Sequence, residues 1–320
     1  MSTEHRIPHA PPGEHRPVKH RPVTIPRLAE MKERGEPIVM VTAYDYPSAQ
    51  VAEEAQVDVV LVGDTAAMTV LGYDSTVPVS MDEMVMLASA VRRGAHTPLV
   101  IGDLPFGSYQ ASNELAVGSA VRYMKEAGCD AVKMEMAGVS GGVADKRESV
   151  ARARAVVAAG IPVMGHVGLT PQSASALGGY RTQGRTMQQA VQVADDALAL
   201  QDAGCFAVVF EAVPAAVTEV IVERMRIPVI GIGAGSSTDG QVLVFHDMLG
   251  LHDERSPRFV KRFAESKQAM VEGMRAYAEE VRDGRFPAAE HAYSIDPAEL
   301  ERFREVIAPG KPWDAADFMT

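Results

Sequence analysis

Four acidic side chains follow or close apolar runs that have the composition of buried strands. Asp64 follows VVLVG, Asp103 follows LVIG, Glu135 closes AVKME, and Glu211 closes AVVFE. One such acid is commonly explained as a helix N-cap, because aspartate caps helices well. Four acids at four such positions indicate a shared polar site instead.

The chemistry available to such a site depends on how its negative charges are balanced. Several carboxylates that lie close together repel one another unless a positive group joins them. Lys133 is one candidate and a divalent cation is another. With only carboxylate oxygens on offer, the cation should be a hard one such as Mg²⁺. An α-keto acid would chelate this ion through two oxygens, and a carboxylate that does not bind the metal could then remove a proton beside the polarised carbonyl.

The elements that must position these acids follow a regular pattern from Ile38 onward. Continuous apolar runs alternate with alanine-rich segments of helical spacing, which is typical of a parallel sheet covered by helices. Eight such runs over about 210 residues favour a (β/α)₈ barrel, whose active site lies at the carboxyl ends of the strands. The link between Gly235 and Gln241 is too short for a full helix. The expected strands are 38–44, 57–64, 98–103, 130–136, 161–169, 206–212, 227–235 and 240–247.

The chain divides into three parts by composition. Residues 1–23 belong to a proline- and histidine-rich stretch without periodicity, and we expect a disordered arm there rather than a metal site. The catalytic barrel is expected over 24–255. Charged, helix-prone segments over 256–320 predict C-terminal helices that pack on the barrel or on a neighbouring subunit.

The overall composition excludes several classes of protein. The net charge is −11 over 320 residues, and the acidic body offers no basic stripe for nucleic acid. Cys129 and Cys205 are the only cysteines, and their spacing fits neither a disulfide scaffold nor a metal site. No apolar run approaches the ~20 residues of a membrane span, and the N-terminus lacks a signal peptide's apolar core. We therefore expect a cytoplasmic protein.

The motifs around these acids resemble the ketopantoate hydroxymethyltransferase family. The resemblance runs from about Thr24 to Leu251 and is carried by VTAYDYPSA, LVGDTAAMTVLGYDSTVPV, DLPFGSY, AVKME, GHVGLTPQS, GGYRTQGR, FEAVP and IPVIGIGAGSSTDGQVLVFHDMLG. It implies a barrel of the phosphoenolpyruvate/pyruvate type, Mg²⁺, and a homodecamer. It also implies transfer of a hydroxymethyl group from 5,10-methylenetetrahydrofolate to 3-methyl-2-oxobutanoate, which gives ketopantoate in pantothenate synthesis.

The resemblance also assigns roles to particular residues. It implies Asp64 and Asp103 as Mg²⁺ ligands, with Glu135 as a third acidic metal position that can act through water. Lys133 and the hydroxyl of Thr65 join the two aspartates as contacts of the keto acid. The resemblance further implies that Glu211 is the base and that His166 lies near the substrate, although a histidine packed in the barrel wall is an equal alternative.

Two positions depart from the family pattern. Thr65 stands where the family often has serine, which keeps the hydroxyl and adds a methyl group. Met136 stands where a glycine is common, and it is expected to crowd the loop after the fourth strand.

Three other functions compete with this reading. A carbon–carbon lyase of the isocitrate lyase or phosphoenolpyruvate mutase type would share the barrel and the metal, but the Lys-Lys-Cys-Gly-His-type motif of isocitrate lyase relatives does not occur here. An aldolase that forms a Schiff base through Lys133 is a second alternative. A non-catalytic barrel that only binds carboxylates is a third.

Overall fold

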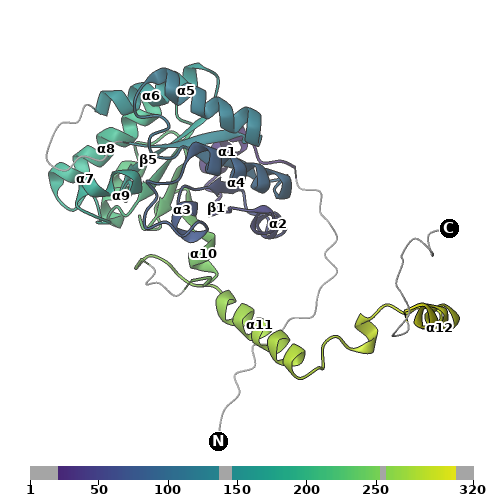
Figure 1. Ribbon diagram of the computed structural model, residues 1–320. Helices are drawn as coiled ribbons and strands as arrows, with labels where there is room; N and C mark the ends of the chain where they lie inside the picture. The colour runs from purple at the N-terminus through teal and green to yellow at the C-terminus, as the bar shows by residue number, and fades with distance from the viewer. Residues whose placement is uncertain (1–20, 137–145, 253–256, 308–320) are drawn as a thin grey trace, which may run out of the picture. The chain divides into compact units, whose positions relative to one another are not determined.

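Eight parallel strands close into a barrel in the order in which they occur in the chain, and β8 pairs with β1 (Figure 1). This is a computed structural model, and it describes residues 21–136, 146–252 and 257–307. The expected eight-stranded barrel is confirmed. The strands are β1 (Ile38–Thr42), β2 (Val59–Val62), β3 (Leu99–Asp103), β4 (Ala131–Glu135), β5 (Val163–Gly168), β6 (Ala207–Glu211), β7 (Val229–Ile232) and β8 (Gly240–Leu243).

Helices follow most strands and cover the outside of the barrel (Figure 1). Residues 233–239, which link β7 to β8, form bends rather than a helix, as expected from the length of this link. The helices of the barrel unit are α1 (Ile25–Glu33), α2 (Tyr46–Glu54), α3 (Ala66–Thr69), α4 (Met81–Gly94), α5 (Asn113–Arg122), the π-helical turn η1 (Tyr123–Ala127), α6 (Lys146–Ala158), the 3₁₀ turn η2 (Pro171–Ser173), α7 (Ala174–Leu177), α8 (Met187–Asp202), α9 (Ala215–Val222) and α10 (Phe245–Met248).

Local sequence explains why these helices form where they do. In α4, Ser80 and Glu83 make a capping box that satisfies the free N–H groups of the first turn. The buried residues Met84, Leu87, Ala88 and Val91 recur at three- and four-residue spacing, so they form one apolar face. That face packs on the outside of the sheet, while the opposite face of α4 meets solvent.

The strands alternate between two apolar clusters, because successive side chains of a strand point to opposite faces. One face packs under the surrounding helices, and the other fills the inside of the barrel. Ile101, Ala131, Met164 and Val209 belong to the interior cluster. Positions two residues further along the same strands must also face inward, now at the carboxyl end. These positions hold polar or charged side chains: Asp103, Lys133, His166 and Glu211.

The described part of the chain begins near the end of the expected arm. Residues 1–20 of the expected arm lie outside the described residues, and Val23 already donates its N–H to the carbonyl of Thr97 at 2.8 Å. The barrel unit extends to Ala264, because the N–H of Phe263 donates to the carbonyl of Met248 at 2.7 Å. This end lies nine residues beyond the expected position 255.

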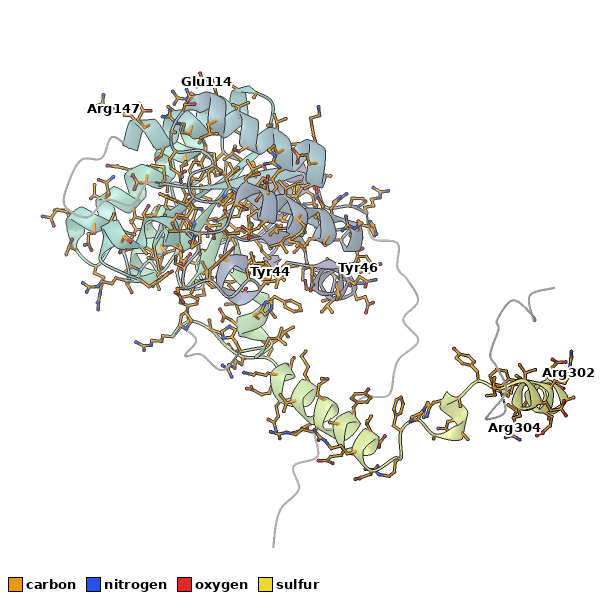
Figure 2. The ribbon with its side chains drawn as sticks, viewed as in Figure 1. Tyr44, Tyr46, Glu114, Arg147, Arg302 and Arg304 are labelled. Atoms are coloured by element: carbon orange, nitrogen blue, oxygen red, sulfur yellow. The ribbon has the colours of Figure 1, made fainter. Side chains whose placement is uncertain are left out.

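A second compact unit begins at Glu265. On α12, Arg302 and Arg304 form ion pairs with Glu299 and Glu301 at the exposed surface (Figure 2). Within the described residues, no helix has the length and apolar character needed to cross a bilayer. The helices of this unit are α11 (Ser266–Arg282), the 3₁₀ turn η3 (Ala289–His291) and α12 (Pro297–Val306).

Candidate active site

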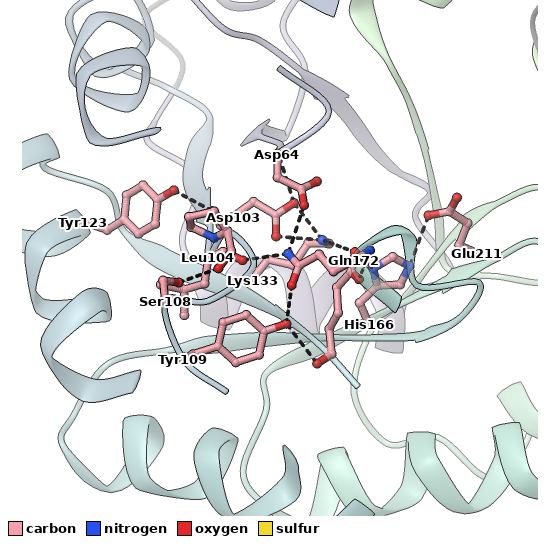
Figure 3. A network of polar contacts seen from close by, with 12 residues as sticks. Asp64, Asp103, Leu104, Ser108, Tyr109, Tyr123, Lys133, His166, Gln172 and Glu211 are labelled. Carbon is pink, nitrogen blue, oxygen red and sulfur yellow. Dashed lines mark hydrogen bonds and ion pairs between the residues drawn. The ribbon is translucent and has the colours of Figure 1, made fainter. Parts of the chain in front are cut away.

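Charged side chains from neighbouring strands meet at the carboxyl end of the barrel (Figure 3). Asp103 and Lys133 are register partners on β3 and β4, and Lys133 Nζ lies 2.8 Å from both carboxylate oxygens of Asp103. Asp64 follows β2, and its backbone N–H donates to Asp103 Oδ2 at 3.2 Å. All three residues are buried. The barrel therefore gathers these residues into one pair of carboxylates with one lysine.

Asp103 is fixed from behind by the π-helical turn η1. Tyr123, the first residue of this turn, donates its hydroxyl to the carbonyl of Asp103 at 2.5 Å. The ring of Tyr123 fills the space beside Gly102, where an added Cβ would lie 2.5 Å from the ring. Single π turns inside helices are often found at functional sites. Here the turn brings an aromatic side chain against the strand that carries Asp103.

His166 on β5 lies between two glutamates. Its Nδ1 is 3.3 Å from Glu135 Oε1, and its Nε2 is 3.2 Å from Glu211 Oε2. Both are close ion-pair contacts, although neither has the geometry of a good hydrogen bond. Glu135 and His166 are register partners on β4 and β5, which explains their contact. The histidine thus connects the glutamate beside Lys133 to the glutamate proposed as the base.

The backbone around Glu211 is tightly constrained. The carbonyl of Glu211 accepts the N–H of Leu169 at 2.8 Å, and a Cβ on Gly168 would lie 2.3 Å from that carbonyl oxygen. Ala212, the next residue, has a φ of 49°, which is unusual for a residue other than glycine. Backbone strain of this kind tends to occur at functional sites. The surrounding contacts, such as the bond from Leu169, hold the end of β6 in this conformation.

Burial and crowding of like charges shape the electrostatics of the site. Burial raises the pKa of Asp64 well above its usual range, and the nearby charges of Asp103 and Glu135 raise it further. Burial also raises the pKa of Asp103, although Lys133 works against this rise. A carboxylate pair of this kind gains from additional positive charge. The site therefore favours a bound cation.

For Lys133 and Glu135, the neighbouring charges outweigh burial and favour the charged form of the side chain. Burial lowers the pKa of Lys133, but Asp103 and Glu135 outweigh this effect and raise it, so the ammonium stays charged. Burial raises the pKa of Glu135, but His166 and Lys133 outweigh this effect and lower it. Burial and Lys133 lower the pKa of His166, whereas Glu135 and Glu211 raise it to about 9. The site thus holds Lys133⁺ and Glu135⁻ at neutral pH, and it favours the imidazolium form of His166.

Gln172 is a site residue to which the sequence analysis assigned no role. Its side-chain Nε2 donates to Asp64 Oδ2 at 3.0 Å and to the carbonyl of Leu104 at 2.8 Å. Its backbone N–H donates to Glu135 Oε2 at 3.0 Å. The residue stands in the TPQS stretch directly after β5, so its position beyond a strand end was the available signal. A polar loop residue has no periodic pattern, however, and the sequence could not show where it points.

The two positions that depart from the family pattern lie beside the site. Thr65 directly follows Asp64 and stands at the N-cap position of α3, but its hydroxyl does not cap that helix. Met136 is buried, and its N–H donates to the carbonyl of His166 at 3.0 Å. The loop that Met136 was expected to crowd, residues 137–145, lies outside the described residues.

The donor set fits a hard cation with few protein ligands. Asp64 and Asp103 offer carboxylate oxygens, which Mg²⁺ prefers, and burial together with neighbouring carboxylates raises the pKa values of both groups. Among the residues that the structure describes, no group of three or more His, Cys, Asp or Glu side chains is arranged as a complete ligand set. Mg²⁺ is usually held by one or two carboxylates and keeps several waters. Two direct aspartate ligands, with Glu135 acting through water, are consistent with this arrangement.

Comparisons with known proteins point to one enzyme family. A family model described as ketopantoate hydroxymethyltransferase matches residues 22–289. The 3-methyl-2-oxobutanoate hydroxymethyltransferase of Carboxydothermus hydrogenoformans is 51% identical over 280 residues, which cover 88% of this chain and 98% of that protein. The enzyme of the same name from Moorella thermoacetica is 54% identical over 271 residues, which cover 85% and 97%.

Solved structures of low sequence identity share the fold. A 2,3-dimethylmalate lyase, described as a PEP mutase/isocitrate lyase superfamily member, has a TM-score of 0.55 at 19% identity, covering 87% of this chain and 93% of that chain. A phosphonopyruvate hydrolase complex with oxalate and Mg²⁺ has a TM-score of 0.55 at 15% identity, covering 89% and 98%. These similarities confirm the fold, a (β/α)₈ barrel.

Proposed function

The chain belongs to the ketopantoate hydroxymethyltransferase family, and we propose that its buried charge cluster binds the keto acid and the metal of that reaction. The chain is an enzyme that transfers a hydroxymethyl group to 3-methyl-2-oxobutanoate, the activity named for its relatives. We propose 5,10-methylenetetrahydrofolate as the one-carbon donor and Mg²⁺ as the metal. The product is ketopantoate, a precursor in pantothenate and coenzyme A synthesis.

One observation carries the assignment of the site. Two buried aspartates meet at adjacent strand ends: the N–H of Asp64 donates to Asp103 Oδ2, and Lys133 Nζ contacts both oxygens of Asp103 at 2.8 Å. Lys133 and the imidazolium form of His166 do not balance the four carboxylates of the site together, and the surplus negative charge suits a cation. When bound, Mg²⁺ would polarise the carbonyl of the keto acid and stabilise the enolate formed beside it. Asp64 and Asp103 would hold the ion, with Glu135 acting through water.

The residues of this chain would then divide the remaining work. Lys133 offers a fixed positive charge to the oxygens of the keto acid, and Thr65 offers a hydroxyl group at the same edge of the barrel. Glu211 lies across His166 from the acids proposed to bind the metal, so it need not bind the metal itself and can act as the base. Its carboxylate removes the proton on C3 of the keto acid, and the electron pair of that C–H bond forms the enolate.

The carbon–carbon bond forms in the next step. The methylene bridge of the folate opens to an iminium ion, and C3 of the enolate attacks the methylene carbon. Water then cleaves the C–N bond of the adduct: its hydroxyl group stays on the methylene carbon, its hydrogen goes to one folate nitrogen, and the proton taken from C3 goes to the other. This gives ketopantoate and tetrahydrofolate. His166 Nε2 lies 3.2 Å from Glu211 Oε2, so the charge of the imidazolium can hold the carboxylate in place until it takes up the proton. A positioned proton transfer of this kind contributes about 10²–10⁴-fold to the rate.

The competing functions find less support in the site. Burial raises the pKa values of Cys129 and Cys205 to about 12, so neither thiol suits a lyase that relies on a reactive cysteine. Asp103 and Glu135 raise the pKa of Lys133, which keeps its ammonium charged and opposes a Schiff base. The superfamily fold is shared with lyases, but fold alone does not assign chemistry.

An assay of product formation tests the proposal directly. Purified full-length protein is supplied with 3-methyl-2-oxobutanoate and 5,10-methylenetetrahydrofolate, and ketopantoate is measured by mass spectrometry. We expect product with Mg²⁺ and loss of product after EDTA treatment, with recovery when Mg²⁺ is restored. Product formation that persists in EDTA would contradict the role of the metal. Reduction with borohydride in the presence of the keto acid would reveal a Schiff base, and we expect no such adduct.

Two further expectations concern the setting of the enzyme. We propose a homo-oligomer, with a homodecamer as the family resemblance implies, and exposed apolar residues on α11 support a contact there. We also propose a cytoplasmic location, which fractionation of cells that express a tagged chain would test. Two plant relatives are named as mitochondrial, so the location can differ among relatives.

A further inference from the structure

The side-chain amide of Gln172 uses all of its hydrogen-bonding positions. Nε2 donates to Asp64 Oδ2 and to the carbonyl of Leu104, while Oε1 accepts from the hydroxyl of Tyr109 at 2.7 Å and from Gln110 Nε2 at 3.2 Å (Figure 3). An amide turned by 180° would place its oxygen against two acceptors and its NH₂ group against the NH₂ group of Gln110. The network therefore fixes the orientation of the amide.

The backbone of Gln172 is fixed as well. It lies within the single 3₁₀ turn η2, which begins at Pro171 and follows Thr170 in an extended conformation, as expected before proline. Its N–H donates to Glu135 Oε2 at 3.0 Å. Gln172 is 6% exposed, so water cannot replace these bonds easily. Gln172, in the turn after β5, thus contacts groups at the carboxyl ends of β2, β3 and β4.

We propose that Gln172 is a positioning residue that sets the orientation of the Asp64 carboxylate, and through it the metal and keto-acid contacts of the site. This inference rests on the proposed function. The amide donates to one oxygen of Asp64, which limits rotation of the carboxylate about its last bond. Asp64 in turn donates its N–H to Asp103, the partner of Lys133. The chain of contacts runs from Gln172 to both aspartates and to the lysine.

The expected size of the effect follows from the kind of bond that is lost. A hydrogen bond to a charged group is stronger than one between neutral groups, so its loss is costly at a buried site. Partners that orient metal ligands typically change metal affinity by about 10–100-fold when they are mutated. Loss of the amide should therefore weaken metal binding by about that factor. It should also raise the KM for the keto acid more than it lowers the kcat at saturating metal.

The test uses Mn²⁺ as the probe, because its free ion gives an EPR signal. Full-length wild type, Gln172→Met and Tyr109→Phe are titrated with Mn²⁺ at a temperature where circular dichroism shows each to be folded. Gln172→Met keeps the length of the side chain and removes the amide, and we expect its Kd to rise at least tenfold. Tyr109→Phe keeps Gln172 but removes a donor that fixes its amide, so we expect a smaller rise, about twofold to fivefold.

Gln201→Met is the matched control. Gln201 is also 6% exposed and accepts a hydrogen bond from the N–H of Arg226 at 2.6 Å, but it lies on α8, outside the barrel. The Kd of the Gln201→Met variant for Mn²⁺ should stay within twofold of wild type. An unchanged Kd and KM in folded Gln172→Met would overturn the positioning role. If that variant does not fold, an unchanged Kd in Tyr109→Phe would overturn it. A wild type that does not bind Mn²⁺ would instead contradict the proposed function, and the inference with it.

Discussion

Asp103 and Lys133 face each other across adjacent strands, and the ammonium lies 2.8 Å from both carboxylate oxygens. The two side chains are 2% and 5% exposed, so almost no water screens the pair. Each faces inward because it stands two residues beyond an interior apolar side chain, Ile101 or Ala131. The pair therefore lies at the boundary between the apolar interior of the barrel and the polar site at its carboxyl end.

Replacement of Lys133 by methionine should destabilise the protein and abolish most activity. Removal of one partner from a buried ion pair typically costs about 3–5 kcal/mol, because the other charge remains buried. We expect urea unfolding to show a loss of this size, with Mg²⁺ restoring part of it. Lys32→Met is the control, since Lys32 pairs with Asp239 at 2.8 Å outside the proposed site. It should lose less stability and keep its activity, whereas full activity in Lys133→Met would exclude a substrate role for the lysine.

Replacement of Glu211 by glutamine should remove the base without removing the metal site. The keto acid exchanges its C3 proton for deuterium in D₂O when a base acts on it, and NMR follows this exchange without the folate. We expect the exchange rate to fall by about 10²–10⁴-fold, the usual contribution of a positioned base. The control is Glu219→Gln, a change at an exposed position on α9, and it should catalyse the exchange at the rate of wild type. Exchange that persists in Glu211→Gln would remove Glu211 from this role.

Replacement of Gly168 by alanine should disturb Glu211 through the backbone. The φ of Gly168 is 92°, and an added Cβ would lie 2.3 Å from the carbonyl oxygen of Glu211. Gly160→Ala is a close control, because Gly160 has a φ of 83° and nothing within 4 Å of an added Cβ. The control should lose about 1–2 kcal/mol of stability from its left-handed backbone alone. Gly168→Ala should lose more, and only this variant should also lose activity.

Much of the site could be predicted from the sequence because the barrel follows simple rules. Eight apolar runs separated by helical segments indicate the closed sheet, and the sheet brings residues at its strand ends together. Alternation along a strand then places Asp103, Lys133, His166 and Glu211 on the interior face. These rules need no knowledge of the loops.

The contacts made by loops could not be predicted in the same way. Gln172 meets Asp64 although 108 positions separate them, and this contact depends on the path of the chain after β5. The left-handed conformation of Ala212 is equally hidden, because alanine rarely adopts it. The π turn at Tyr123 has no pattern distinct from an ordinary helix end. Periodicity therefore predicts where the site lies, whereas the path of the loops and local backbone strain determine its detailed contacts.

The stability of the metal-free protein should fall between neutral and alkaline pH because of His166. Glu135 and Glu211 raise its pKa to about 9, above the unfolded value of about 6.5. Its stabilising contribution is complete below pH of about 6.5 and is lost as the pH rises through about 9. The loss is on the order of 3 kcal/mol by linkage. Urea unfolding in EDTA from pH 6 to 10 measures it, and His166→Gln should show a flatter profile. Identical slopes would exclude a stabilised imidazolium.

The second unit offers a test of assembly on α11. Met270, Met274, Tyr277 and Val281 are 62%, 69%, 55% and 45% exposed, and their spacing places them on one face of the helix. Within the described residues, no side chain of this helix is buried. An apolar stripe of this kind is typical of a contact with another chain. We infer that a neighbouring subunit covers it in the proposed homo-oligomer.

A charge in the stripe should therefore weaken assembly. We expect Met274→Lys to shift the mass of the full-length protein toward smaller species in light scattering after size exclusion, because a lysine ammonium is costly to bury. Gln268→Lys adds the same charge on another face of α11, where it can still pair with Glu272, and it should keep the mass of wild type. Equal masses for all three proteins would show that the stripe is not part of the subunit contact. A fall in mass confined to Met274→Lys, with ketopantoate formation retained, would show that the contact serves assembly and that each barrel supplies its own acids.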